Sequence, residues 1–130
     1  MNDSIGKDNE SKPARVLLVE DTPLIRKLIV TMLQQHNFIV FEAGHGKEAL
    51  EKLEEARPDI ILCDLSMPEM DGLEFLKTMK SNEATRSIPI AILSADEGRE
   101  LKEELLAAGA VALLDKAMPY GELAVGRGCR

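Results

Sequence analysis

Short apolar runs alternate along most of the chain with longer segments in which apolar residues recur at helical spacing. The runs are each about one strand long and occupy residues 16–19, 38–41, 60–63, 90–93 and 111–114. The first, third and fourth runs are almost continuously apolar, which is typical of parallel strands that are covered on both faces. The pattern therefore predicts five strands separated by helices.

Apolar stripes with a spacing of three or four residues predict a helix between each pair of strands. Thr22 and Pro23 suit the N-cap and the first turn of the first helix. Asp71 suits the N-cap of the third, and Gly109 suits the stop after the fourth. The stripes consist of Leu24, Leu28 and Met32 with Ile25, Ile29 and Leu33 beside them, then Ala49, Leu50 and Leu53, then Leu73, Leu76 and Met79, and then Leu101, Leu105 and Ala108.

Strict alternation of strands and helices predicts an α/β fold with right-handed crossovers. We expect a flavodoxin-like, doubly wound, five-stranded parallel sheet of strand order 2-1-3-4-5, with helices on both faces. A fifth helix after Tyr120 is expected to be short or irregular, because Gly126 and Gly128 weaken it. The expected organisation is a disordered polar leader over residues 1–13, one domain over 14–125 and a flexible tail over 126–130.

Composition and charge narrow the class of protein. The 130 residues fit one domain, and the formal net charge of −7 argues against direct nucleic-acid binding, which needs a basic face. No apolar run approaches the roughly 20 residues that cross a bilayer, so we expect no membrane insertion. Cys63 lies in an apolar run and is predicted to be buried, and neither cysteine has zinc-ligand spacing. A reducing, cytoplasmic setting fits best.

Polar residues follow the predicted strands at the edge where a parallel sheet binds its ligands. Glu20 and Asp21 follow the first strand, Asp64 the third and Ser94 the fourth, and Lys116 lies just after the fifth. In the expected order, the first and third strands are neighbours, so three carboxylates converge. Two carboxylates at ~4 Å repel by ~4 kcal/mol at an effective dielectric near 20, so the cluster needs a cation or a retained proton. Oxygen ligands with open water positions suit Mg²⁺.

Several motifs resemble those of response-regulator receiver domains, and the resemblance covers roughly residues 14–120. The opening VLLVED resembles the first strand of that family and its acidic end. The segment DIILCDLSMPEMDG is a highly specific match to the family's third strand and following loop. The motifs lie at residues 16–21 and 59–72, with further matches at 88–90, 93–95 and 109–110.

The resemblance implies a phosphoacceptor switch of a two-component phosphorelay. Asp64 would take a phosphoryl group from a histidine kinase or a phosphotransfer protein. Ser94 would hydrogen-bond the phosphoryl oxygen, and Lys116 would pair with the Asp64 carboxylate or its phosphate. The switch would then alter a partner-binding face for a downstream effector or for a C-terminal output domain that this sequence lacks. The implied Mg²⁺ ligands are Glu20, Asp21, Asp64 and the backbone carbonyl of Ser66.

The sequence departs from the family's pattern near the fifth strand. Ala117 follows Lys116 where the family usually has proline, and Leu113 stands where many members carry a switching tyrosine or phenylalanine. Asp115 could compete for the Lys116 ammonium. These departures concern the output face, and they motivate an alternative: a degenerate receiver that acts as a constitutive interaction or dimerisation module.

Two further classes fit less well. A haloacid-dehalogenase-type phosphatase also uses an aspartyl nucleophile, but it requires a second aspartate two residues later, and Ser66 stands there. A flavodoxin-like FMN binder is disfavoured because Glu20 and Asp21 would repel the phosphate. We therefore expect no enzyme activity beyond the domain's own phosphorylation and dephosphorylation.

Overall fold

The computed structural model describes residues 12–94 and 98–116. Five parallel strands form one sheet in the order β2-β1-β3-β4-β5, as the sequence predicts. The strands are β1 (Arg15–Val19), β2 (Ile39–Ala43), β3 (Ile60–Asp64), β4 (Ile90–Ser94) and β5 (Ala112–Asp115). The helices between them are α2 (Pro23–Gln35), α3 (Gly46–Ala56), α4 (Gly72–Ser81) and α5 (Arg99–Ala107). The α/β class and the strand order are therefore confirmed.

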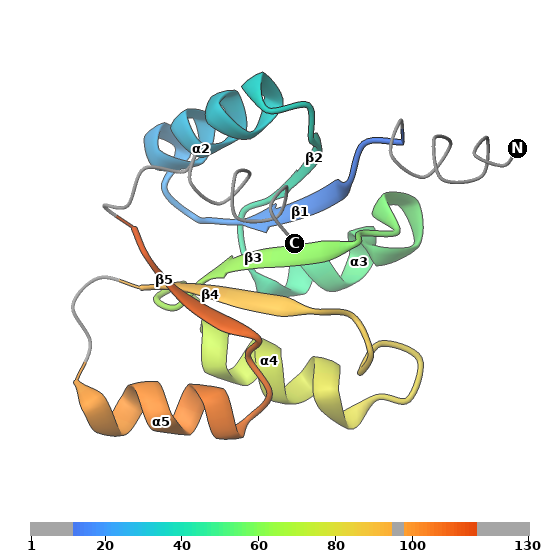
Figure 1. The fold of residues 1–130 in the computed structure, drawn as a ribbon. Coiled ribbons are helices and arrows are strands. Elements are labelled where there is room, and N and C mark those ends of the chain that lie inside the picture. Colours follow the sequence, from blue (N-terminus) through green and yellow to red (C-terminus); the bar gives the residue numbers. More distant parts are fainter. Residues whose placement is uncertain (1–11, 95–97, 117–130) are drawn as a thin grey trace, which may run out of the picture.

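The described helices lie on both faces of the sheet (Figure 1). Leu17 and Val19 of β1 point into a core shared with α3, α4 and α5, whereas Val16 and Leu18 point into a second core under α2. This alternation follows from the two-residue period of a strand. Burying both faces leaves the ends of the central strands as the place where polar groups can gather, which explains why the candidate site lies there.

Some boundaries differ from the prediction. Strand β2 runs from Ile39 to Ala43 rather than over 38–41, because Glu42 and Ala43 pair with the end of β1 although Glu42 is polar. Asp64 and Ser94 are the last residues of their strands, not the first residues of the loops that follow. The leader up to residue 11, the predicted fifth helix, the tail and Ala117 lie outside the described residues.

The helix ends agree with the prediction in part. Asp71 caps α4 in a capping box with Glu74, and Gly109 adopts a φ of 116° just past α5. Thr22 occupies the N-cap position of α2, but its side chain makes no capping hydrogen bond. The N-cap of α3 is His45, whose Nδ1 accepts a hydrogen bond from the Glu48 amide at 3.2 Å, and the sequence did not suggest this cap.

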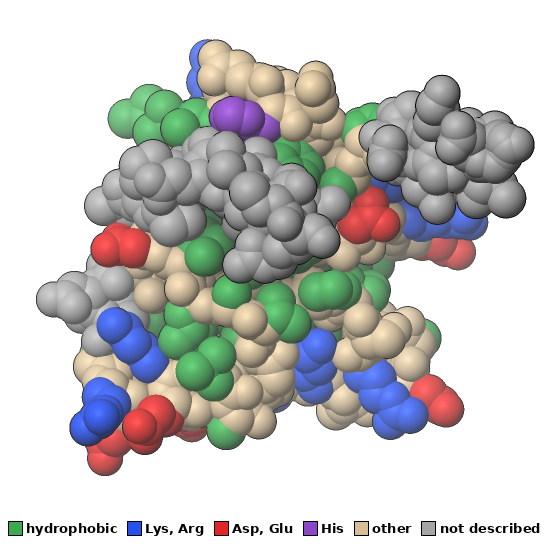
Figure 2. Space-filling model, in the orientation of Figure 1, with side chains coloured by type: hydrophobic (Ala, Val, Ile, Leu, Met, Phe, Trp, Pro, Cys, Tyr) green, Lys and Arg blue, Asp and Glu red, His purple; other side chains and the backbone are tan. Residues whose placement is uncertain are grey.

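The surface is of mixed charge. Figure 2 shows side chains of both signs over α5, where Arg99 and Glu103 form an exposed ion pair. Leu24 and Leu28 of α2 are largely exposed, whereas Ile25, Ile29, Met32 and Leu33 pack in the core under this helix. No helix within the described ranges is both long and apolar enough to cross a membrane.

Candidate functional site

Three carboxylates meet at the carboxyl-terminal ends of two neighbouring interior strands, β1 and β3. Glu20 and Asp21 follow β1, and Asp64 ends β3, which pairs directly with β1. One carboxylate oxygen of each residue lies within 4.8 Å of the other two. The predicted convergence of these acids is therefore present in the structure.

Two of the three acids are buried. The Glu20 residue is fully buried, and Asp64 is only 4% exposed, whereas Asp21 is half-buried. The backbone amide of Thr22 donates to Glu20 Oε2 at 3.2 Å, but Glu20 Oε1 accepts no hydrogen bond within the described part of the chain. Burying a charged oxygen without a donor is unfavourable, so the arrangement requires a cation close by.

Lys116 supplies one such cation. Its amine lies 3.2 Å from Asp64 Oδ1 and 3.2 Å from Glu20 Oε1, and it donates to Glu20 Oε2 at 3.4 Å. Its backbone amide donates to the Ser94 carbonyl at 2.9 Å, which ties the end of β5 to the end of β4. Burial alone would lower the pKa of Lys116, but the charges of Asp64 and Glu20 outweigh it and raise that pKa.

The same surroundings change the acidity of Asp64. Burial, together with the negative charge of Glu20, raises the pKa of Asp64 from its ordinary 3.8 to about 6. Lys116 opposes the rise through its charge and its hydrogen bond, and Asp21 supports it. One ammonium therefore does not fully compensate the cluster, which leaves a net attraction for a further cation.

The backbone around Asp64 is held from two sides. The Leu65 amide donates to the Leu93 carbonyl at 3.0 Å, and the Gly72 amide donates to the Leu65 carbonyl at 2.7 Å. A Cβ at position 72 would lie 2.7 Å from the Asp64 carbonyl oxygen and 2.9 Å from Leu65 Cα. Only glycine therefore lets the start of α4 pack directly against the end of β3.

The other predicted site residues lie beside this cluster. Ser94 is buried at the end of β4, the strand next to β3. Ser66 is exposed in the loop that follows Asp64. Asp71, which could have been a fourth acidic ligand, instead caps α4, and among the described residues the acidic cluster comprises only Glu20, Asp21 and Asp64. Ala95, the last residue of the motif match at 93–95, lies outside the described residues.

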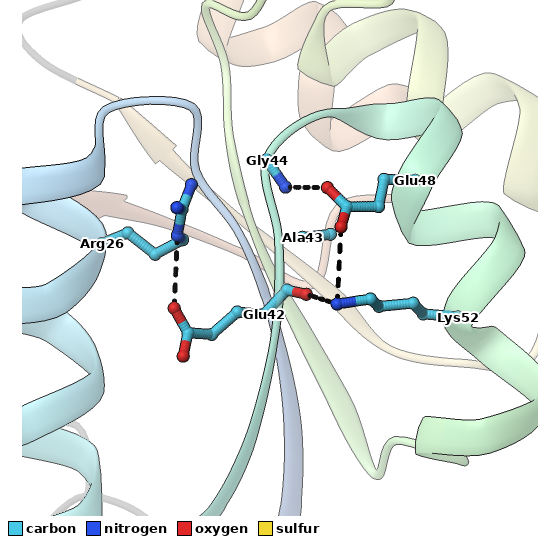
Figure 3. A pocket seen from close by; sticks show the side chains of 6 residues that line it. All are labelled: Arg26, Glu42, Ala43, Gly44, Glu48 and Lys52. Carbon is cyan, nitrogen blue, oxygen red and sulfur yellow. Dashed lines mark hydrogen bonds and ion pairs between the residues drawn. The ribbon is translucent and has the colours of Figure 1, made fainter.

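Arg26 is a neighbour of the site that the sequence analysis did not single out. Its Nη1 donates to the Glu20 carbonyl at 2.8 Å, and its Nε pairs with Glu42 Oε1 at 3.2 Å (Figure 3). The available signal was an arginine on the helix that follows an acidic strand end. Helical periodicity alone could not show that its side chain turns back toward that end.

The residues present fit a divalent cation of the Mg²⁺ type. Carboxylate oxygens are hard ligands, and Mg²⁺ is usually bound by one or two carboxylates while it keeps several waters. The buried Glu20 Oε1 has the Lys116 amine 3.2 Å away but accepts no hydrogen bond from the described residues, so it is an oxygen that a metal ion would satisfy directly or through water. Glu20, Asp21 and Asp64 are therefore the residues that could hold the ion.

Comparison with known proteins identifies the family. The sequence model of the response regulator receiver domain matches residues 16–125. The structure is similar to that of the chemotaxis protein CheY4 of Vibrio cholerae, with a TM-score of 0.80, 34% identity and coverage of 90% of this chain and 98% of that one. The chain therefore belongs to the response regulator receiver domain family of two-component signalling, as its motifs predicted.

Curated relatives are longer than this chain. The transcriptional regulatory protein PdtaR of Mycobacterium tuberculosis is 40% identical over 122 residues, which cover 88% of this chain and 58% of PdtaR. A protein-glutamate methylesterase/protein-glutamine glutaminase of Syntrophomonas wolfei is 36% identical over 115 residues, which cover 85% of this chain and 31% of that protein. The chain thus spans between about a third and three fifths of these two relatives.

Proposed function

We propose that this domain is a phosphoacceptor switch in which Asp64 is phosphorylated with the help of Mg²⁺. The observation that carries the proposal is the cluster of Glu20, Asp21 and Asp64 carboxylates within 4.8 Å, with the Lys116 amine 3.2 Å from Asp64. A carboxylate nucleophile between a cation site and an ammonium suits phosphoryl transfer, because both positive charges can neutralise the phosphoryl oxygens as the new bond forms.

In the proposed transfer, a carboxylate oxygen of Asp64 attacks the phosphorus of a phosphohistidine on a histidine kinase or phosphotransfer protein. The new oxygen–phosphorus bond forms as the nitrogen–phosphorus bond breaks, and the imidazole leaves with the electron pair. Bound Mg²⁺ would supply charge neutralisation at the phosphoryl oxygens. Glu20, Asp21, Asp64 and the Ser66 carbonyl are the proposed ligands of that ion.

Lys116 and Ser94 are the proposed partners of the phosphoryl group. Lys116 already lies 3.2 Å from Asp64, so its ammonium can pair with a phosphate formed there. Ser94 ends the adjacent strand, and its hydroxyl could donate to a phosphoryl oxygen. Phosphorylation would add a charge of about −1.5 to −2 beside these two groups. Because both groups lie at the ends of β4 and β5, their movement would reach the surface that these strands share with α5.

The proposed readout of this movement is the binding of an effector protein or of an output domain. PdtaR and the methylesterase extend well beyond the matched region, which supports an output domain in the same polypeptide, whereas CheY4 is covered almost completely, which fits an output on a separate partner. We propose no enzyme activity for this domain beyond its own phosphorylation and dephosphorylation.

Intact mass after incubation with acetyl phosphate, with and without Mg²⁺, tests the acceptor chemistry. We expect one added phosphoryl group, only with Mg²⁺, in the wild type and in a control Asp71→Asn variant, and none in Asp64→Asn. Asp71→Asn removes an exposed nearby acid while it keeps an oxygen that can cap α4. Absence of any phosphoryl group in the wild type would favour the alternative, a constitutive interaction or dimerisation module.

A further inference from the structure

Arg26 joins two strand ends that lie side by side. It extends from α2, donates from Nη1 to the Glu20 carbonyl at 2.8 Å, and pairs through Nε with Glu42 Oε1 at 3.2 Å. Glu20 is the first residue after β1, and Glu42 belongs to β2. The Glu20 amide also donates to the Ala43 carbonyl at 3.0 Å. The backbone of Glu20 is therefore held on its amide side by β2 and on its carbonyl side by Arg26.

The Glu20 carbonyl belongs to the peptide that joins Glu20 to Asp21, two of the proposed metal ligands. Any shift of this peptide as a unit also moves both carboxylates, because the two Cα atoms that carry them belong to the same rigid plane. Mg²⁺ tolerates little departure from octahedral geometry, so its affinity depends on where these oxygens stand. Removing a group that hydrogen-bonds to a metal-binding residue and so orients it generally lowers metal affinity by about 10- to 100-fold.

We propose that Arg26 is a positioning residue for the Mg²⁺ site: it fixes the Glu20–Asp21 peptide through the Glu20 carbonyl and uses Glu42 as its own anchor. This inference rests on the proposed function of the acidic cluster. An arginine suits the role because its planar guanidinium donates in two fixed directions at once, which a lysine cannot do. The Arg26 side chain is 25% exposed, so its hydrogen bonds are partly shielded from water.

The pocket in which Arg26 lies supplies a matched control, and its lining residues are Arg26, Glu42, Ala43, Gly44, Glu48 and Lys52. The Lys52 amine of α3 donates a hydrogen bond to the Glu42 carbonyl and lies 3.4 Å from Glu48 Oε2. The other oxygen of that carboxylate, Glu48 Oε1, accepts a hydrogen bond from the Gly44 amide (Figure 3). Lys52 thus tethers the end of β2 to α3, but it has no contact with Glu20 among the described interactions. Replacing either side chain removes one positive charge and one cross-link from this pocket, but of the two only Arg26 bonds directly to a residue of the proposed metal site.

The test compares the wild type, Arg26→Met, Arg26→Lys and Lys52→Met by calorimetric titration with Mg²⁺. We expect Arg26→Met to weaken Mg²⁺ binding by about 10-fold or more, and Lys52→Met to bind as the wild type does. Arg26→Lys should recover part of the lost affinity, because its ammonium reaches one of the two partners. Urea unfolding of the metal-free proteins verifies that all four are folded at the titration temperature.

A second measurement does not depend on metal. Amide hydrogen exchange at Glu20 and Thr22 without Mg²⁺ should be faster in Arg26→Met than in the wild type and Lys52→Met. Both amides belong to the segment that Arg26 holds and are hydrogen-bonded, the Glu20 amide to the Ala43 carbonyl and the Thr22 amide to Glu20 Oε2. Wild-type Mg²⁺ affinity in Arg26→Met would overturn the inference while the acceptor chemistry stood. Equal weakening in Lys52→Met would also overturn it, since the effect would then be general. A wild-type protein that binds no Mg²⁺ would overturn both this inference and the proposed function.

Discussion

The ammonium of Lys116 is shared between Asp64 and Glu20, with its Nζ atom 3.2 Å from Asp64 Oδ1 and 3.2 Å from Glu20 Oε1. The two carboxylates come from β3 and from the end of β1, and the lysine follows β5, so the contact spans the sheet from its centre to one edge. Because one positive charge serves two buried negative charges, the site keeps an excess of negative charge that controls its response to pH, to metal and to mutation.

Replacement of Lys116 by methionine should raise the pKa of Asp64 above about 6. Burial and Glu20 already raise this pKa, and Lys116 opposes the rise, so its loss removes the main compensating charge. The carboxyl carbon shift of Asp64 in ¹³C-labelled protein, titrated without metal, measures the change. Lys47→Met is the control, since Lys47 pairs with Glu69 on the surface. An Asp64 titration that is unchanged in Lys116→Met would show that the ion pair is absent in solution.

Asp64→Asn should stabilise the metal-free protein at neutral pH. The pKa of Asp64 is about 6 in the folded state and 3.8 ordinarily. As the pH rises, Asp64 therefore loses its proton at a lower pH in the unfolded chain than in the folded protein. The favourable contribution of protonated Asp64 is complete below about pH 4 and is lost as the pH rises through about 6. Each tenfold difference in acidity corresponds to ~1.4 kcal/mol, so the gain in Asp64→Asn should approach about 3 kcal/mol above pH 7.

Urea unfolding of the wild type and Asp64→Asn at pH 4 and pH 7.5 measures this gain. The free energies of unfolding should be similar at pH 4 and should separate at pH 7.5. Saturating Mg²⁺ should reduce the separation, because it stabilises the folded wild type by mass action. A gain of the same size at both pH values would mean that charge burial is not its cause.

Gly72→Ala should destabilise the domain and disturb the acceptor. The added Cβ would lie 2.7 Å from the Asp64 carbonyl oxygen and 2.9 Å from Leu65 Cα, and backbone atoms cannot move aside as a flexible side chain can. Overpacking of this kind costs about 1–3 kcal/mol. Gly98→Ala is the matched control, because a Cβ there meets nothing within 4 Å. Thermal unfolding compares the two, and equal losses would contradict the proposed close approach.

Asp71→Ala should lower the free energy of unfolding by about 1 kcal/mol, because it removes the N-cap of α4. The Asp71 carboxylate accepts from the Glu74 amide at 2.9 Å, and the Glu74 side chain accepts from the Asp71 amide at 3.3 Å. Asp71→Asn should retain most of the stability. Both variants should bind Mg²⁺ as the wild type does, and a loss of affinity by calorimetry would instead make Asp71 part of the metal site.

Much of the fold follows from the apolar runs. The wrong boundary of β2 and the unexpected exposure of part of α2 both have physical reasons. The interior strands β1, β3 and β4 were predicted from continuous apolar sequence, because both of their faces are covered. Strand β2 lies at an edge, where Glu42 can face solvent, so hydropathy placed its end too early. The exposure of Leu24 likewise depends on which side of α2 meets the sheet, and periodicity alone does not decide between two adjacent stripes.

The candidate site was predictable to a different degree. The convergence of Glu20, Asp21 and Asp64 followed from strand order, because parallel strands end at one edge. The particular role of Lys116 came from family resemblance, since nothing local in the sequence aims its side chain. Arg26 was missed because its significance lies in two tertiary contacts, with a backbone carbonyl and with a neighbouring strand.

The burial of Cys63 gives the domain an internal chemical probe. Its thiol is fully buried on the strand that carries Asp64, and burial, together with the charges of Asp64 and Glu20, raises its pKa well above the ordinary value. Only the thiolate attacks alkylating reagents, and burial keeps Cys63 protonated and inaccessible, so Cys63 reacts only when the centre of the sheet opens. The rate at which iodoacetamide labels this residue should therefore report how often the structure around the acceptor comes apart, in unaltered protein and without a spectroscopic label.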